Sequence, residues 1–294
     1  MPVRTEAVMG TLVTIHVVHS DHETGVHQAM ERAFHWFQEI ESRCTRFDQH
    51  SELMQLTAQI GVRVPVSAIL CEAVRFSQMV AEESGGAFDP TVGHRMETRG
   101  FNREHRTGEI ICTPIASRDD VSYRDIEVDA EKQTIRLDRP LVLDLGGVAK
   151  GLAVDMAARE LEVFRDFAID AGGDLYLGGS NPQGTAWSVG IRHPRRENEL
   201  IDHLRVSNQA VCTSGDYERV GCHIIDLRTG GSSDEVASAT VVAPGAMLAD
   251  ALATAAFVLG PEAGIELLTR LGVEGLIITP GLERYETRGL CHGA

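Results

Sequence analysis

Asp250 and Thr254 stand four residues apart in a stretch, 246–260, that is otherwise almost wholly apolar. On a helix this spacing puts both side chains on one face, about 5–6 Å apart at Cβ. A carboxylate and a hydroxyl oxygen are hard ligands suited to Mg²⁺, which takes few protein ligands and fills its shell with phosphate and water. The structural alternative is that Asp250 caps the helix and Thr254 bonds back to a carbonyl.

A second tract, Leu143–Asp155, reads Leu-Asp-Leu-Gly-Gly-Val-Ala-Lys-Gly-Leu-Ala-Val-Asp. The apolar run Leu141–Leu145 predicts a buried strand, and the pattern after the two glycines predicts a helix with Lys150 in its first turn. The acid Asp144 would then end the strand. Glycine backbone and free N–H groups at a helix start suit an anion. The tract is neither a Walker A loop nor a Gly-x-Gly-x-x-Gly motif, so it suggests a phosphate-bearing ligand held in another way.

Two further tracts are less specific. The sequence 85–91, Gly-Gly-Ala-Phe-Asp-Pro-Thr, indicates a turn. Its functional interpretation places the ring of Phe88 and the carboxylate of Asp89 at a small-residue opening where a flat ligand could lie. The run 223–226, His-Ile-Ile-Asp, predicts a short strand with His223 and Ile225 on one face. Such a histidine could act as a general base on a hydroxyl, although one His among twelve is more often structural.

Composition limits the function classes. The formal net charge of −16 argues against a nucleic-acid or anionic-membrane surface, so an anionic ligand needs local amides, basic groups or a metal ion. Six scattered cysteines without a Cys-x-x-Cys pair favour reduced thiols over disulfides or structural zinc. No apolar run is long enough for a membrane span. The N-terminus shows no signal-peptide core or lipobox cysteine, which predicts a cytoplasmic protein.

The elements that must position these residues arrive as clusters of strands between helices. Helices are predicted at 24–42, 67–83, 148–163, 247–259 and 262–271. Strands are predicted at 11–18, 125–129, 133–137, 141–145, 167–170, 174–178, 186–192, 201–206, 209–213, 222–226, 238–243 and 275–279. This order favours an α+β fold, with mixed or antiparallel strand clusters packed with helices, over a doubly wound sheet.

Taken in order, these tracts resemble the ApbE family, the FAD:protein FMN transferases. The matching stretches are Met9-Gly10-Thr11, Arg46-Phe47-Asp48, Ser51-Glu52-Leu53, Gly86-Ala87-Phe88-Asp89-Pro90, Asp144-Leu145-Gly146-Gly147-Val148-Ala149-Lys150-Gly151, Gly172-Gly173-Asp174, His223-Ile224-Ile225-Asp226, Thr229-Gly230 and Ala249-Asp250-Ala251-Leu252-Ala253-Thr254. They run in register from near the first residue to about residue 260.

The resemblance implies an ApbE-like, T-fold-like architecture over residues 1–294, as a single domain or two closely packed lobes. It also implies that FMN passes from FAD to a Ser/Thr hydroxyl in the flavinylation motif of an acceptor flavoprotein, with Mg²⁺ helping to hold the diphosphate and AMP released. The implied metal ligands are the Gly147 carbonyl, Asp250 and Thr254. The implied flavin-nucleotide contacts are Met9, Phe47, Ala87, Phe88, Asp89, Asp144 and Lys150. Ile225 joins them because it would share a strand face with His223, the candidate catalytic base.

Two alternatives remain open on the same residues. Water could replace the acceptor hydroxyl, which would make the protein an FAD pyrophosphatase that yields FMN and AMP. The chain could bind FAD without turnover. Self-modification at Thr240 is suggested by 234–240, which loosely echoes the acceptor motif, but Thr240 falls in a predicted buried strand, so we interpret this match as coincidence. Two departures from the family pattern, Arg99 in place of a Trp and Thr57 in place of an Asn, bear on acceptor choice more than on FAD binding.

Overall fold

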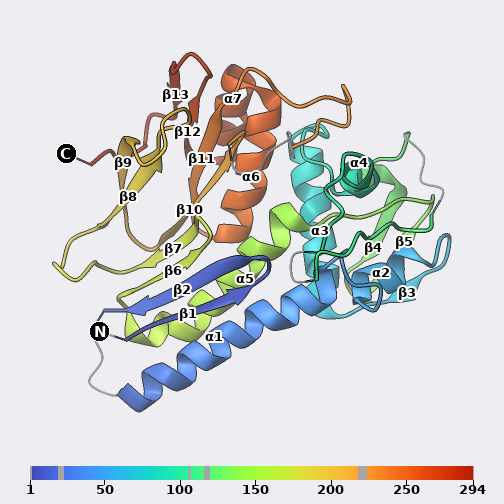
Figure 1. The fold of residues 1–294 in the computed structure, drawn as a ribbon, viewed down its shortest axis with the longest axis horizontal. Helices are drawn as coiled ribbons and strands as arrows, with labels where there is room; N and C mark the ends of the chain where they lie inside the picture. Colours follow the sequence, from blue (N-terminus) through green and yellow to red (C-terminus); the bar gives the residue numbers. More distant parts are fainter. Residues whose placement is uncertain (1, 19–22, 105–106, 116–119, 218–223, 294) are drawn as a thin grey trace.

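The computed structural model describes residues 2–18, 23–104, 107–115, 120–217 and 224–293. Its largest element is an eight-stranded sheet in which every neighbouring pair is antiparallel (Figure 1). The strands lie in the order β1 (Val3–Val8), β2 (Thr11–Val17), β6 (Phe167–Ala171), β7 (Asp174–Gly178), β10 (Gln209–Gly215), β11 (Ser238–Ala243), β12 (Glu274–Ile278) and β13 (Arg284–Glu286). The antiparallel strands and packed helices confirm the predicted α+β class.

Four helices cover one face of this sheet (Figure 1). They are α1 (Glu23–Cys44), α5 (Gly146–Leu161), α6 (Ala246–Leu259) and α7 (Pro261–Leu271). The hairpin of β8 (Trp187–Arg192) and β9 (Leu200–Val206) packs on the other face, where it forms a separate apolar cluster with β7 and β10–β12. Because it is covered on both sides, β11 is buried at every residue.

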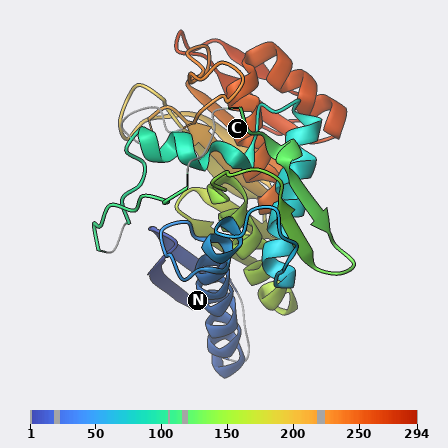
Figure 2. The ribbon, with the colours of Figure 1, turned by 90° about the vertical axis from the view of Figure 1, so that its right-hand side faces the viewer.

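A smaller lobe-like group lies beside the helices, at the right of Figure 1 and facing the viewer in Figure 2. It holds α2 (Glu52–Thr57), α3 (Ala68–Glu83), η1 (Pro90–Val92), α4 (Gly93–Thr98), η2 (Tyr123–Asp125) and the sheet β3 (Val64–Pro65), β5 (Thr134–Leu137), β4 (Ile126–Asp129). Ser67 begins α3 as predicted, because its hydroxyl accepts from Leu70 N at 3.2 Å. Buried side chains of β5 belong to the same apolar core as those of α1, α5 and α6.

Helices α5 and α6 meet backbone to backbone. A Cβ atom at Gly151 would lie 2.5 Å from the Ala246 carbonyl oxygen, so only glycine fits there. The Asp155 carboxylate accepts from Ala246 N at 2.6 Å and from Met247 N at 3.0 Å. These are orphan donors of the first turn of α6, so an acid on α5 caps its neighbour.

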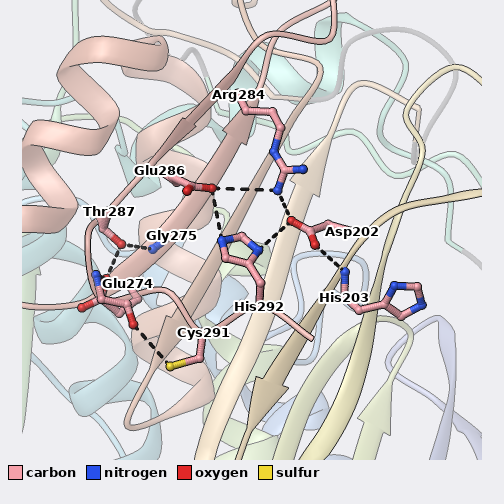
Figure 3. A network of polar contacts seen from close by, with 10 residues as sticks. Asp202, His203, Glu274, Gly275, Arg284, Glu286, Thr287, Cys291 and His292 are labelled. Carbon is pink, nitrogen blue, oxygen red and sulfur yellow. Dashed lines mark hydrogen bonds and ion pairs between the residues drawn. The ribbon is translucent and has the colours of Figure 1, made fainter. Parts of the chain in front are cut away.

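The C-terminal segment is tied to the sheet by a polar network (Figure 3). His292 Nδ1 lies 2.9 Å from Asp202 Oδ2 of β9, and its Nε2 lies 3.3 Å from Glu286 Oε2 of β13. Arg284 pairs with the same Asp202. The network joins the β8–β9 hairpin to the edge of the main sheet, on the side away from α5.

Most predicted helices and strands are confirmed to within about two residues, but two strand predictions are wrong. Residues 141–145 are buried yet belong to no sheet: Val142 O accepts from Gly93 N, and Asp144 N donates to Pro90 O. Residues 224–226 are likewise not a strand, and 222–223 lie outside the described residues. Helix α5 begins at Gly146, so Lys150 falls in its second turn.

Other sequence expectations concern thiols and membranes. All five cysteines in the described ranges are free; Cys44, Cys71 and Cys212 are buried, and Cys112 and Cys291 are exposed. Within the same ranges, none of the helices is long and apolar enough to cross a membrane.

The α5–α6 contact predicts the outcome of a single methyl addition. Gly151→Ala should lower the free energy of unfolding by about 1–3 kcal/mol, because the new Cβ meets backbone that cannot rotate away. Gly25→Ala, in the first turn of α1 with no atom within 4 Å of its Cβ, is the matched control and should be neutral or stabilising. Denaturant unfolding measures both. Equal stability of the two variants would contradict the close contact.

Candidate functional site

A cavity of about 530 Å³ opens where the α1–α2 loop, the start of α5, the end of β10 and α6 converge. Eleven of the twelve residues expected at the site line this one cavity. They are Met9, Phe47, Ala87, Phe88, Asp89, Asp144, Gly147, Lys150, Ile225, Asp250 and Thr254. The twelfth, His223, lies outside the described residues. Segments far apart in sequence are therefore brought together at a single place.

Thr254 points from α6 towards Gly147 in the first turn of α5, and Asp250 lies within electrostatic reach of Lys150 in the second turn. Asp250 is 8% exposed and lies in the second turn of α6, so the alternative that it caps this helix is wrong. Thr254 Oγ1 lies 3.2 Å from Ser214 Oγ at the end of β10. That contact leaves the hydroxyl of Thr254 beside the cavity and oriented by a second hydroxyl.

Gly147 places backbone of α5 next to these side chains. A Cβ atom built on Gly147 would lie 3.1 Å from the Phe88 ring and 3.6 Å from Thr254 Oγ1. The missing side chain thus lets the helix start approach both the ring and the hydroxyl. The turn before it is fixed by Asp144 Oδ1, which accepts from Gly146 N at 2.8 Å.

Three charged side chains, Lys150, Asp174 and Asp250, interact at the floor of the cavity, which Lys150 and Asp250 line. Lys150 forms an ion pair with Asp174, which is 2% exposed at the start of β7 and does not line the cavity. Burial alone would lower the pKa of Lys150, but the carboxylates of Asp174 and Asp250 together raise it above the ordinary value. The ammonium ion is therefore held in its charged form. Asp174 belongs to the Gly172-Gly173-Asp174 motif, yet the sequence alone gives no sign that it pairs with Lys150.

Arg46 is a second residue whose part the sequence does not reveal. It is 3% exposed, and its Nε donates to Asp144 Oδ2 at 2.5 Å while its Nη2 donates to the Phe101 carbonyl. Its guanidinium lies 4.2 Å from the centroid of the Phe47 ring. Arg46 thus braces three loops at the cavity wall and holds the Asp144 carboxylate in place. Its Arg-Phe-Asp context in the sequence could have marked it, but a lone Arg in a loop carries no burial signal.

The Asp89 carboxylate stabilises the turn that the sequence predicts at residues 85–91. Oδ1 accepts from the Thr91 backbone at 2.9 Å and from the Thr91 hydroxyl at 2.8 Å, and Oδ2 accepts from Tyr123 N at 3.0 Å. Burial raises the pKa of Asp89 even though these bonds act to lower it. It shapes the loop that carries Phe88 into the cavity.

Met9 and Ile225 reach the cavity from turns and loops. Met9 and Gly10 form the two-residue β1–β2 turn, with φ of 51° and 72°, as a type I′ turn requires. Ile224 and Ile225 both line the cavity, so the strand pleat that singled out Ile225 is not the reason for its position.

The side chains at α6 form an oxygen set suited to a hard cation. One carboxylate and one hydroxyl, with the backbone of Gly147 next to the hydroxyl, are of the kind that Mg²⁺ accepts when a phosphate ligand completes its shell. Within the described ranges, no group of three or more His, Cys, Asp and Glu side chains could hold a metal ion by itself. A metal at this place would therefore share its shell with ligand oxygens.

The two departures from the family pattern have clear positions. Thr57 is fully buried in α2 and its hydroxyl donates to Leu53 O at 2.8 Å, away from the cavity. Arg99 is exposed after α4 and donates to Gly230 O at 2.6 Å, which links α4 to the loop after Asp226. Thr57 is thus a helix residue and Arg99 a surface link between loops.

The comparisons with known proteins agree with this geometry. The ApbE family model matches residues 9–277. The chain is 32% identical over 308 residues to the FAD:protein FMN transferase of Treponema pallidum, covering 94% of this chain and 84% of that protein. It is 32% identical over 245 residues to the protein of the same name from Haemophilus influenzae, covering 77% of this chain and 68% of that one.

A solved structure shows the same fold. The crystal structure of the ApbE protein of Thermotoga maritima has a TM-score of 0.85 and 27% identity, and the match covers 98% of this chain and 97% of that one. Near-complete coverage in both directions leaves no large part of either fold unmatched. The family match and the shared fold, together with the residues gathered at the cavity, mean that this chain belongs to the ApbE family.

Proposed function

We propose that this protein transfers FMN from FAD to a Ser/Thr hydroxyl of an acceptor flavoprotein, with Mg²⁺ bound beside the diphosphate and AMP as the second product. The observation that carries the proposal is the convergence of eleven expected site residues on one cavity, in a chain whose relatives are named FAD:protein FMN transferases. The same cavity offers an aromatic part and a charged part, as a flavin nucleotide requires.

The aromatic part would receive the isoalloxazine ring. Phe47, backed by the Arg46 guanidinium, and Phe88, packed near Gly147, present ring surfaces to the cavity. Met9 adds a flexible apolar side chain. Flat stacking surfaces with few polar groups suit a planar heteroaromatic ring.

The charged part would receive the diphosphate. Lys150 supplies one positive charge, and the positive end of the α5 helix dipole adds to it. In a protein of net charge −16, one ammonium does not balance a diphosphate. The carboxylate of Asp250, the hydroxyl of Thr254 and the Gly147 carbonyl would hold Mg²⁺, which neutralises phosphoryl charge and polarises the phosphorus for attack.

The transfer step itself is a displacement at phosphorus, in which the chain's own residues move a proton and stabilise charge. The acceptor hydroxyl oxygen attacks the FMN phosphorus, a new P–O bond forms, and the bond to the AMP oxygen breaks in line with it. The hydroxyl proton passes to a base, for which we propose His223 from the sequence motif. Lys150 stabilises the negative charge that develops on the diphosphate oxygens. Asp144, fixed by Arg46, orients the nucleotide.

The structure bears differently on the three alternatives of self-modification, FAD hydrolysis and FAD binding without turnover. Thr240 is 1% exposed in β11 and its hydroxyl lies 2.9 Å from Thr213 Oγ1, so its burial argues against self-modification. FAD hydrolysis differs from transfer only in the attacking oxygen, and the same cavity would serve it. A non-catalytic FAD carrier would need neither a cation beside Asp250 nor a base.

A single incubation distinguishes FMN transfer from FAD hydrolysis and from FAD binding without turnover. FAD, Mg²⁺ and a candidate acceptor domain should give an acceptor whose intact mass rises by one FMN, with an equal amount of AMP. EDTA should abolish both products because the diphosphate charge is then unbalanced. Fast AMP release without acceptor would identify a hydrolase instead, and tight FAD binding with no AMP would identify a carrier.

Asp250→Asn tests the cation ligand. The change keeps the size of the side chain and removes its charge, so Mn²⁺ affinity should fall about 10–100-fold and transfer should fall with it. Asp129→Asn is the matched control, because Asp129 lies in β4, bonded to Lys132 and away from the cavity. Isothermal titration with Mn²⁺ and acceptor mass measure the two effects. Unchanged Mn²⁺ affinity in Asp250→Asn would remove Asp250 from the site.

A further inference from the structure

The Asp174–Lys150 pair has a role that goes beyond charge pairing in the core. We propose that Asp174 is a positioning residue: it anchors the Lys150 ammonium at the cavity floor and so keeps that ammonium from competing with a divalent cation for the Asp250 carboxylate. This inference rests on the proposed function, because it concerns the same cation site. Asp174 itself lies behind the cavity wall and would touch neither FAD nor metal.

The position of Asp174 is fixed by the β6–β7 turn. Gly172 and Gly173 have φ of 67° and 103°, and Ala171 pairs with Asp174 across the turn. A Cβ atom at Gly172 would lie 2.1 Å from Thr11 Oγ1, so the turn is held against β2. A carboxylate at the first position of β7 therefore has little freedom to move.

Lys150 lies within electrostatic reach of both carboxylates. It pairs directly with Asp174, while Asp250 contributes a further favourable interaction. Cys212 lies next to the same three groups, and burial followed by the charges of Asp174 and Asp250 raises the pKa of its thiol, so it stays neutral. One ammonium and two carboxylates leave a local charge of −1, which favours one additional cation.

Removing the Asp174 carboxylate would change the carboxylate with which Lys150 forms an ion pair. A half-buried ammonium without a counter-ion is unfavourable, so Lys150 would turn to the remaining carboxylate, that of Asp250. The ammonium and Mg²⁺ would then compete for the same oxygen atoms. The local charge would also rise from −1 to zero, and both effects act against cation binding.

The inference predicts a suppression effect between two substitutions. Asp174→Asn should weaken Mn²⁺ binding about 10-fold or more, as loss of an outer partner typically does. Adding Lys150→Met removes the competing ammonium and restores the local charge of −1, so Asp174→Asn/Lys150→Met should bind Mn²⁺ almost as tightly as the unaltered protein. Asp129→Asn, in β4 and away from the cavity, is the control and should leave the affinity unchanged.

Titration with Mn²⁺ alone, followed by calorimetry, gives these affinities without FAD or transfer. Thermal unfolding verifies that each variant is folded, and the crystal structure of Asp174→Asn should show Lys150 Nζ in contact with the Asp250 carboxylate. Unchanged affinity in Asp174→Asn, no recovery in the folded double variant, or a Lys150 that stays away from Asp250 would each overturn the inference. Absence of Mn²⁺ binding to the unaltered protein, both alone and with FAD present, would instead overturn the cation site of the proposed function, and this inference with it.

Discussion

At Gly151 the backbone of α5 lies so close to α6 that a Cβ atom would come within 2.5 Å of the Ala246 carbonyl oxygen. Four residues further along α5, Asp155 caps the first turn of α6 through two backbone N–H groups. These contacts fix one helix against the other in both direction and rotation. Gly147 and Lys150 on α5 therefore face Asp250 and Thr254 on α6, and the cavity takes its charged wall from this one crossing.

The net negative charge of the chain opposes the binding of an anionic ligand in this cavity. A net charge of −16 repels a diphosphate, and Lys150 is already paired with Asp174. The proposed cation would resolve this conflict locally, because Asp250 attracts it and the FAD oxygens complete its shell. The helix dipole of α5 then adds a smaller, directional term. Stability and binding thus draw on the same few groups, which is why the substitutions that probe them need matched controls.

The sequence was sufficient for the elements with strong periodicity. The apolar residues of α1 at helical spacing, the Ser67 cap and the apolar α6 all predicted their helices. It misled at Leu141–Leu145, where a buried apolar run looks like a strand although its backbone bonds to η1 and α4. The motif residues correctly predicted which side chains line the cavity, because the family resemblance assigns them to one site. The partners Arg46 and Asp174 could not be predicted, since a buried ion pair depends on tertiary contacts that leave no local pattern.

The most direct test is an anomalous difference map from crystals grown with FAD and Mn²⁺. A metal peak should lie between the Gly147 carbonyl, the Asp250 carboxylate and the Thr254 hydroxyl, about 2.1–2.3 Å from each oxygen, with the FAD diphosphate completing the shell. A peak bound by other residues, or an ordered FAD diphosphate held at Lys150 with no metal beside it, would contradict the composite site built on α5 and α6.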